Sequence, residues 1–358
     1  MTEISKKIYK KSFEKKKKIF QEEFGESSKI KFFPSPHINF RYRTEFGLLK
    51  LDNKFSYAMT LNGKKEPVKS FLIVSERIQK LMQSLLNYIN EFSSISEKLF
   101  QIEFQSARNN DAMITLIYHR NLDKDWFDQA SKIASELDIS VIGRSKKQIL
   151  VVGNNYITEN YKFLNQEFTL RLYEQCFSQT NPYICDDMLD WVSKNRIKDK
   201  KDIVELHCGL GTFTIPLSTL YEKVLATENS RPSFRALQKN ISLNQRKNIS
   251  CGRLSGRETI EALTQVRPFR RLSSINLRDF EINNIFLDPP REGLDQYTRD
   301  HIQEIENIIY ISCGFEAFKR DLSILRKTHD LKELAMFDQF PYTDHIESGV
   351  ILKRKAPG

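Results

Sequence analysis

The sequence has no run of about 18 apolar residues, the minimum for a transmembrane helix, so we expect no membrane span. Its first residues, Met1 to Lys7, lack the apolar core of a secretion signal, which makes the cytoplasm the expected location. Internal repeats and low-complexity linkers are absent too, which argues against a repeat array. With 358 residues, the chain is long enough for two domains with separate cores.

Cysteines are few and scattered. No two of them form a Cys-x-x-Cys pair, so the spacings of a zinc ribbon or an iron–sulfur cluster are missing and no metal is expected. An odd number of cysteines in a cytoplasmic chain fits free thiols, one of which is available to react. The five are Cys176, Cys185, Cys208, Cys251 and Cys313.

Negative charge is in deficit, because 56 lysines and arginines face 46 aspartates and glutamates, a formal net charge of +10. Such an excess favours a polyanionic partner, nucleic acid first, although a solvated lysine surface would give the same count. The run from Lys15 to Lys18 falls on an expected helix, and we interpret it as a solvated face.

Two kinds of pattern divide the chain near residue 170. Residues 1–170 mix helical spacing, as in Ser75 to Phe92, with strand-like runs such as Phe100 to Gln105 and Met113 to Tyr118, which predicts an α+β domain. Residues 171–358 alternate strands with helices, which predicts an α/β, Rossmann-like domain around a doubly wound parallel sheet.

Polar residues of the second half follow the expected strands. Ligands of doubly wound sheets bind beyond the carboxyl ends of the strands. The strands expected at 202–206, 223–227, 285–287 and 308–311 place acids, an imidazole and a thiol at or just beyond these ends, which predicts a single site there. The residues concerned are Glu205, His207, Glu228, Asp288 and Cys313.

The first of these strands leads into a Gly-x-Gly turn, Gly209-Leu210-Gly211. Glycine lets the backbone approach a ligand closely, but the third glycine of a dinucleotide fingerprint is missing. Glu228 ends the next strand, where a carboxylate can accept both ribose hydroxyls. Strand, glycine turn, helix, strand and acid together favour an S-adenosylmethionine site. A helix cap before Arg231 is the simpler alternative for Glu228.

Three sequence motifs near the C-terminus together resemble those of one enzyme family. Asp288-Pro289-Pro290-Arg291, Ile311-Ser312-Cys313 and the segment from Asp338 to Glu347 resemble the RNA 5-methyluridine methyltransferases, and among them the enzymes that methylate tRNA. The similarity extends through Phe100-Gln101-Ile102 and Phe177-Ser178-Gln179 and covers most of the chain. It implies that the N-terminal domain binds RNA and that the C-terminal domain is the methyltransferase.

The resemblance implies covalent catalysis with S-adenosylmethionine as the cofactor. The C5 atom of uracil is a poor nucleophile, and a thiolate that adds to C6 makes C5 reactive toward a methyl donor. Cys313 is implied as this nucleophile and Glu347 as the base that removes the C5 proton. We expect a lowered pKa for the Cys313 thiol, since only the thiolate attacks, and a raised pKa for Glu347.

Further positions carry over residue by residue. For the cofactor, the resemblance implies contacts from Gln179, His207, Thr212, Glu228 and Asp288. For RNA, whose target base must leave its stack, it implies contacts from Glu45, Phe100 and His119. A core position is the simpler alternative for Phe100. Candidate phosphate contacts are Arg41, Arg43, Arg120 and Arg144.

Some positions depart from the family pattern. The family continues Ser-Cys-Asn-Pro, whereas Gly314-Phe315 follows the cysteine here. Its Arg-x-Arg-x-Glu-Phe-Arg pattern ends in Gly47 here. Its Gly-Asn-Gly-Asn-Phe turn reads Gly209 to Phe213, after His207 in place of an aromatic residue. Both implied catalytic residues are intact.

The sequence therefore predicts an S-adenosylmethionine-dependent tRNA (uracil-5-)-methyltransferase that acts as a monomer on the T-loop within the T-arm, or on other RNAs with a T-loop-like hairpin. An rRNA enzyme is one rival, although such relatives often carry a four-cysteine cluster and an extra barrel that this chain lacks. An amino-group methyltransferase would have an aromatic residue at Arg291. RNA cytosine-5 enzymes would place a second cysteine near Asp288. A catalytically weakened RNA-binding protein is the rival from another class.

Overall fold

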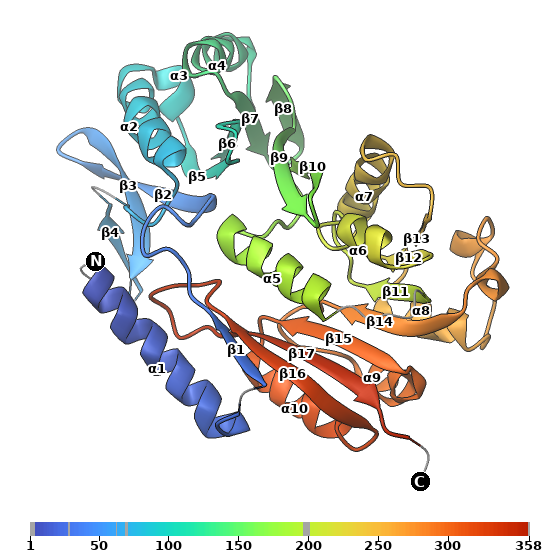
Figure 1. Cartoon of the computed structure of the whole chain (residues 1–358). Helices are drawn as coiled ribbons and strands as arrows, with labels where there is room; N and C mark the ends of the chain where they lie inside the picture. The colour runs from blue at the N-terminus through green and yellow to red at the C-terminus, as the bar shows by residue number, and fades with distance from the viewer. Residues whose placement is uncertain (1–3, 28, 62, 69–70, 196–200, 357–358) are drawn as a thin grey trace.

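A computed structural model describes residues 4–27, 29–61, 63–68, 71–195 and 201–356. Two large sheets dominate the molecule, one above the other in Figure 1, with a two-stranded ribbon and helix α5 between them. None of the helices in these ranges is long and apolar enough to cross a membrane. All five cysteines are free thiols.

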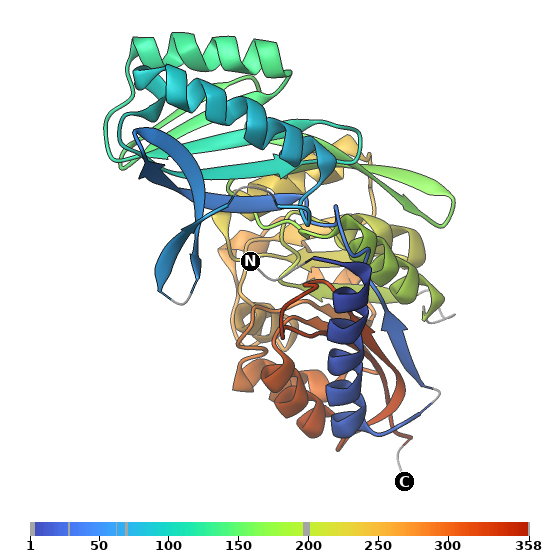
Figure 2. The ribbon, with the colours of Figure 1, turned by 90° about the vertical axis from the view of Figure 1, so that its left-hand side faces the viewer.

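The upper part is a seven-stranded sheet in the order β4-β3-β2-β5-β6-β7-β8. Its strands are β2 (Arg43–Leu51), β3 (Lys54–Leu61), β4 (Lys64–Pro67), β5 (Leu99–Ser106), β6 (Ala112–Tyr118), β7 (Ser140–Ser145) and β8 (Gln148–Val152). Neighbouring strands are antiparallel except β6 and β7. One face is covered by helices, as Figure 2 shows: α2 (Glu76–Glu91), α3 (Ser93–Ser96) and α4 (Lys124–Leu137).

Helix capping and the spacing of apolar residues explain why α2 packs on this face of the upper sheet. Ser75 begins α2 by accepting the N–H of Ile78, and the buried residues of the helix recur at helical spacing on one side. In β2, Phe46 and Leu48 point into the core, whereas Glu45, directly before Phe46, is exposed on the other face. The sheet therefore has a face packed under α2 and α4 and an open, polar face.

The lower part is an eight-stranded sheet in the order β1-β16-β17-β15-β14-β11-β12-β13. Its strands are β1 (Ile30–Phe33), β11 (Asp202–Leu206), β12 (Val224–Thr227), β13 (Ile249–Gly252), β14 (Ile282–Leu287), β15 (Asn307–Ser312), β16 (His329–Phe337) and β17 (Glu347–Arg354). The helical segments after β11 are α6 (Thr214–Leu220), α7 (Arg231–Leu243), α8 (Gly256–Leu263), η1 (Arg270–Leu272), η2 (Leu277–Asp279), α9 (Gln296–His301), η3 (Ile302–Glu304) and α10 (Phe315–Leu325).

This lower sheet is mixed. Strands β13, β12, β11, β14 and β15 are parallel, as the alternating pattern predicts. β17, however, runs antiparallel to both β15 and β16. The prediction of a wholly parallel sheet is wrong at this edge, because β16 and β17 are joined directly by residues 338–346 without the crossover helix that parallel neighbours need.

The N-terminal segment packs on the lower sheet. Helix α1 (Lys6–Phe24) inserts the fully buried ring of Phe20 beside Phe315 of α10, at 5.9 Å between ring centres. β1 then pairs in parallel with β16. The boundary expected near residue 170 groups this segment with the upper part. In the structure it contacts the lower sheet instead, because the apolar residues of α1 find their neighbours there.

A ribbon joins the two parts. It consists of β9 (Tyr156–Phe163) and β10 (Gln166–Tyr173), and helix α5 (Pro182–Lys194) follows. Trp191 of α5 packs edge-on against Phe337 of β16, at 5.6 Å between ring centres. From the upper sheet, the Arg43 guanidinium donates to the backbone carbonyls of Glu174 and Cys176 at 2.9 and 2.6 Å. These contacts fix residues 174–180 between the two sheets.

Candidate active site

The thiol and the carboxyl group expected to act together lie opposite each other. β15 ends at Ser312, which pairs with Ser348 of the antiparallel strand β17. Cys313 follows Ser312, and Glu347 precedes Ser348, so the two residues continue the same ladder at the same end. Asp288 directly follows β14, the parallel neighbour of β15. The register therefore brings three chemically active groups, distant in sequence, to one edge of the sheet.

Cys313 is held as a thiol at neutral pH. Burial, together with the neighbouring carboxyl groups of Glu347 and Asp288, raises the pKa of this thiol to about 11, and the Arg291 guanidinium opposes the rise. The expected lowering of the pKa of Cys313 is wrong. Burial and two acids disfavour the thiolate more than a single cation favours it.

The two acids are perturbed in the same direction. Glu347 is buried, and burial first and Asp288 second raise its pKa well above the usual range, which agrees with the expected direction. Burial also raises the pKa of Asp288 to about 7. Strongly shifted pKa values of three neighbouring groups make this edge of the sheet a candidate functional site.

The loop after the thiol is tightly packed. A side chain at Gly314 would overlap the carbonyl oxygen of Arg291, so this position has room for glycine alone while the 288–291 loop keeps its course. Phe315, which follows, packs its ring against Phe20 and Phe24 of α1 at 5.9 and 6.0 Å. On the other side of the loop, Nη2 of Arg291 lies within 2.9–3.0 Å of both ring nitrogens of His345.

The glycine turn after β11 adopts left-handed backbone angles. His207, Gly209 and Gly211 have φ values of 60°, 58° and 101°. The N–H of Gly209 donates to one carboxylate oxygen of Glu228 at 2.9 Å, and the other oxygen accepts the N–H of Ser230 at 2.6 Å. Ser230, not Glu228, is the cap of α7. Glu228 is thus fixed against the glycine turn by two backbone N–H groups.

Two buried polar atoms beside this turn are unsatisfied. In the part of the chain that the structure describes, neither Oε2 of Glu205 nor Oγ1 of Thr214 has a partner with good hydrogen-bond geometry, although the Thr214 hydroxyl lies close enough to the Glu205 carboxyl group to oppose the rise of its pKa. Burial raises the pKa of Glu205 to about 8. A polar ligand beside the turn would offer these two side chains better-aligned hydrogen bonds than they give each other. S-adenosylmethionine, with its hydroxyls and its charged amino-acid end, fits this donor and acceptor set.

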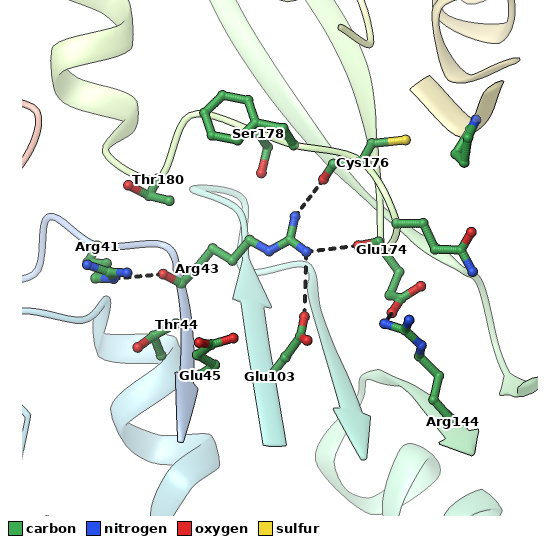
Figure 3. Close-up of a pocket in the computed structure, with 13 residues that line it drawn as sticks. Arg41, Arg43, Thr44, Glu45, Glu103, Arg144, Glu174, Cys176, Ser178 and Thr180 are labelled. Carbon is green, nitrogen blue, oxygen red and sulfur yellow. Dashed lines mark hydrogen bonds and ion pairs between the residues drawn. The ribbon is translucent and has the colours of Figure 1, made fainter. Parts of the chain in front are cut away.

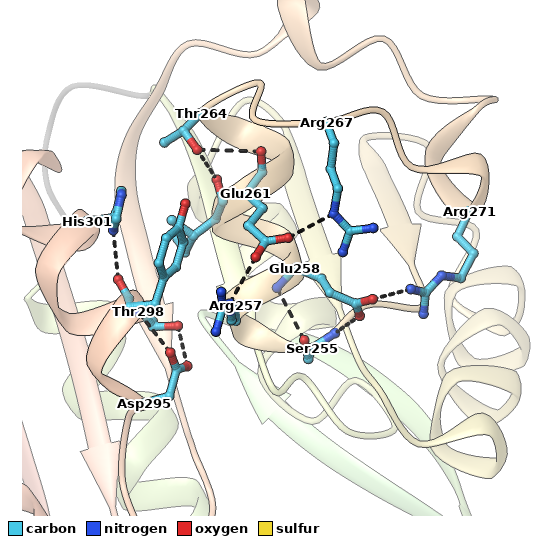
Figure 4. A network of polar contacts seen from close by, with 12 residues as sticks. Ser255, Arg257, Glu258, Glu261, Thr264, Arg267, Arg271, Asp295, Thr298 and His301 are labelled. Carbon is cyan, nitrogen blue, oxygen red and sulfur yellow. Dashed lines mark hydrogen bonds and ion pairs between the residues drawn. The ribbon is translucent and has the colours of Figure 1, made fainter.

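Of the remaining expected cofactor residues, His207 and Thr212 belong to this turn, whereas Gln179 lies beside Gln339. The His207 ring lies against Gly256, where an added Cβ would come within 3.0 Å of Nε2. Gly256 begins α8, whose start is held by the reciprocal Ser255–Glu258 capping box in the polar network of Figure 4. Thr212 is half-buried within the turn itself. Gln179, between the two sheets, accepts the side-chain N–H of Gln339 at 2.7 Å.

The expected RNA contacts lie apart from this edge, on the upper sheet. Phe100 stacks on the exposed imidazole of His119, with 3.9 Å between ring centres and 10° between planes. Phe100 is half-buried, not enclosed in the core. Glu45 accepts the side-chain N–H of Gln101 at 2.9 Å. Glu45 and the Phe100–His119 pair are thus available to a ligand.

A cavity of about 600 Å³ opens between the upper sheet and residues 174–180, and Figure 3 shows its polar lining. Arg43 is fully engaged there, since it bonds two carbonyls and lies 3.5 Å from Glu103. Arg144 pairs with Glu174 at 2.8 Å. Both arginines connect the upper sheet to residues 174–176. Arg41 differs, because only its Nε has a partner in the described ranges, the carbonyl of Arg43.

Comparison with known proteins decides the family. The family model described as tRNA (Uracil-5-)-methyltransferase matches residues 8–355. The chain belongs to this family. A relative from Aliarcobacter butzleri, named tRNA/tmRNA (uracil-C(5))-methyltransferase, is 43% identical over 357 residues, which is 97% of this chain and 95% of the relative. One of the same name from Nitratiruptor is 39% identical over 346 residues, with the same coverage of both chains.

A solved structure supports the fold of this family member. The Pyrococcus abyssi tRNA (uracil-54, C5)-methyltransferase in complex with S-adenosyl-L-homocysteine superposes with a TM-score of 0.73 at 18% identity. The superposition covers 96% of this chain and 83% of the other. At this identity the likeness establishes the fold alone, and it confirms the expected Rossmann-like α/β class.

The sequence-based prediction of a solvated side chain is wrong for one lysine near the site. Lys16 is 2% exposed, and its ammonium group pairs with Asp338 at 2.7 Å, so the solvated-face interpretation is wrong for this lysine. It holds for Lys18, whose side chain is 78% exposed. The helical period could have indicated this burial, because Lys16 lies on the same face of α1 as the buried Tyr9 and Phe20.

Proposed function

We propose that this chain methylates C5 of uridine in the T-loop of tRNA, with S-adenosylmethionine as the methyl donor and through a covalent bond from Cys313 to C6. One observation carries the proposal. The strand register places Cys313, after the end of β15, opposite Glu347, at the start of β17, next to Asp288. Covalent attack on a pyrimidine ring needs a nucleophile and a base on one small site, and this register supplies both.

Each group has a separate step. The Cys313 thiolate adds to C6 of uracil, and the electron pair of the C5–C6 double bond moves toward the O4 carbonyl, giving an enolate. The enolate C5 then takes a methyl group. Bound S-adenosylmethionine supplies that group in an electrophilic form. Glu347, as a carboxylate, removes the proton from C5, and the restored double bond expels the Cys313 thiolate.

The cofactor would be held at the turn after β11. Glu228, already fixed by the N–H groups of Gly209 and Ser230, would accept the ribose hydroxyls. The unpartnered Oε2 of Glu205 would meet a donor of the same ligand. Asp288, His207 and Gln179 would complete the binding site, with Thr212 in the turn. These assignments remain proposals, supported by burial and by orphaned polar atoms.

RNA would be bound on the open face of the upper sheet. An unpaired base can stack on the exposed face of the Phe100–His119 pair, whose two rings are already parallel to each other. Glu45 would meet a donor of a neighbouring nucleotide. Arg41, with its terminal nitrogens free in the described ranges and facing the cavity of Figure 3, is the candidate phosphate contact. The target base would leave its stack to reach Cys313.

The test is a trapped adduct. Incubation with S-adenosylmethionine and a tRNA transcript carrying 5-fluorouridine should give a protein–RNA complex that survives denaturing electrophoresis, because fluorine cannot leave C5 as a proton. Cys313→Ala should abolish the adduct. Cys251→Ala, which changes a half-buried thiol on β13, is the matched control and should form it normally. An adduct that persists in Cys313→Ala would remove this thiol from the mechanism.

Two further outcomes separate the alternatives. RNA binding without any adduct or methyl transfer would favour a binding protein, a reading that the raised pKa of the Cys313 thiol makes worth testing. In Glu347→Gln, adduct formation on ordinary uridine should continue while release slows by about 10²–10⁴-fold, the usual contribution of a general base. Unchanged turnover in that variant would exclude Glu347 as the base.

A further inference from the structure

Lys16 reaches from α1 to the segment that connects β16 with β17. Its ammonium group donates to Oδ1 of Asp338 at 2.7 Å and to the carbonyl oxygen of Phe340 at 2.8 Å. The lysine and aspartate side chains are 3% and 1% exposed. A buried ammonium group is tolerated only when it is paired and hydrogen-bonded, and both conditions are met here. Lys16 thereby fixes the two residues on either side of Gln339.

This segment belongs to the active edge of the sheet. β16 ends at Phe337, which pairs directly with Glu347 at the start of β17. Asp338 follows, and its backbone N–H donates to the carbonyl of Phe33 in β1 at 3.0 Å. Gln339 is therefore only two residues from the position that faces Glu347, and its backbone is fixed on both sides.

The side-chain amide of Gln339 has a hydrogen-bond partner for its nitrogen but not for its oxygen. Its Nε2 donates to Oε1 of Gln179 at 2.7 Å. Its own Oε1 has no partner among the described residues, although the side chain is only 2% exposed. A buried carbonyl oxygen without a donor is costly, so its presence at a binding site points to a ligand. Because Nε2 is engaged by Gln179, the group of the Gln339 amide that is left without a partner is the acceptor oxygen.

We propose that Gln339 is a ligand-binding residue of the methyl-transfer site, whose Oε1 accepts a hydrogen bond from an N–H group of a bound ligand. The inference rests on the proposed function for the identity of that ligand. Two N–H donors suit the oxygen: N3–H of uracil and the ammonium group of S-adenosylmethionine. Uracil N3 carries the hydrogen that cytosine N3 lacks, so the first case would also give base specificity. Lys16 is the positioning residue that holds Gln339 in place.

Gln339→Met tests the proposal, because methionine keeps the length of the side chain and removes the amide. The dissociation constants of S-adenosylhomocysteine and of unmodified tRNA are measured by calorimetry, and methyl transfer is followed in a single turnover. Loss of one hydrogen bond predicts about a tenfold effect. Weaker S-adenosylhomocysteine binding identifies the ammonium group. Unchanged S-adenosylhomocysteine binding with slower transfer or weaker tRNA binding identifies uracil.

Changes below about twofold in all three quantities, in a variant that melts like the wild type, would overturn the proposal. If Gln339→Met fails to fold, Gln339→Glu decides, since it keeps an acceptor oxygen. Binding and transfer within about threefold of the wild type support the proposal, and a larger loss overturns it. Failure of the wild type to methylate tRNA would instead refute the proposed function, and S-adenosylhomocysteine binding would still test Gln339.

Lys16 is tested separately as a positioning residue. Lys16→Arg keeps a cation that can bond Asp338, whereas Lys16→Met does not. If Lys16 acts through Gln339, Lys16→Met should weaken the same constant that Gln339→Met weakens, and Lys16→Arg should restore part of it. In the Gln339→Met background, Lys16→Met should then have little additional effect on that constant. Fully additive effects of the two changes would show that Lys16 acts independently of Gln339.

Discussion

The protonation state of Cys313 makes the pH dependence of methyl transfer predictable. The thiol has a pKa of about 11, so roughly 0.03% of it is ionised at pH 7.5. Since only the thiolate attacks C6, the rate of methyl transfer should follow this small fraction. Over the range from pH 6.5 to 8.5, which stays below the ionisation of uridine itself, the fraction and the rate should rise by at most about 100-fold, and by less where Asp288, whose pKa is about 7, becomes charged and raises the pKa of the thiol further.

The assay counts labelled methyl groups in RNA after a denaturing quench, with enzyme in excess over tRNA. This count includes both the covalent adduct and the released product. It therefore reports the steps up to methyl transfer, which need the Cys313 thiolate but not the proton removal by Glu347. Cys313→Ala should give no label, and Cys251→Ala should give the wild-type slope.

Arg291 supplies a second, independent perturbation. Its guanidinium lowers the pKa of Cys313 against the larger effects of burial and the two acids. Arg291→Met should therefore slow transfer at every pH in this range and leave the slope unchanged, because the thiolate fraction falls by a constant factor. A rate that levels off below about pH 8 would refute the reasoning, since it would mean that the thiol is already ionised when it attacks.

Other predictions concern stability and binding. Glu205 has a folded-state pKa of about 8, so the stability that its neutral form contributes is fully present below pH 4.5 and is lost as the pH rises toward 8. Glutamine cannot ionise, so Glu205→Gln should not lose this stability. Urea titrations should therefore show that the free energy of unfolding of the variant, minus that of the wild type, increases by about 3 kcal/mol from pH 4 to pH 7. Gly314→Ala should displace the 288–291 loop and reduce methyl transfer at least tenfold, with tRNA affinity from filter binding as the unaffected control. Phe100→Ala should weaken tRNA binding by about 1–3 kcal/mol and leave S-adenosylhomocysteine affinity from calorimetry unchanged. Lys16→Met should lower the free energy of unfolding by about 3–5 kcal/mol, and adding Asp338→Leu should restore most of that stability. A flat stability difference for Glu205→Gln, normal transfer in Gly314→Ala, unchanged tRNA affinity in Phe100→Ala, or a fully stable Lys16→Met would contradict the respective interpretation.

Strand ends were predictable because each is a local signal. An apolar run followed by Asp288, or by Cys313, can be read directly from the sequence. Their meeting at one edge follows from the rule for parallel sheets. The position of Glu347 does not follow from that rule, because β17 is antiparallel and presents its start, not its end, at this edge. Only the family resemblance led to Glu347.

Electrostatics were less predictable. The type of a side chain indicates its chemistry, but the pKa of Cys313 depends on burial and on Glu347 and Asp288, which approach it through the fold. Lys16 was missed for a related reason. A lysine among lysines is usually solvated, and its burial depends on Asp338, more than 300 positions away in the sequence. Pairs at that separation leave no trace in a single sequence.

The departure from the family pattern after Cys313 is best understood as a coupled substitution. Glycine at 314 allows the Arg291 carbonyl to approach where a side chain would collide with it. Phe315, in the place of proline, starts α10 and packs against Phe20 and Phe24 of α1. The first change brings the Arg291 carbonyl against the loop that carries the thiol, and the second ties that thiol loop to α1. Because α1 also carries Lys16, the thiol loop and the Glu347 segment are held by one helix. The altered loop therefore has its own packing, and its effect on rate should appear in the geometry around Cys313 rather than in loss of the fold.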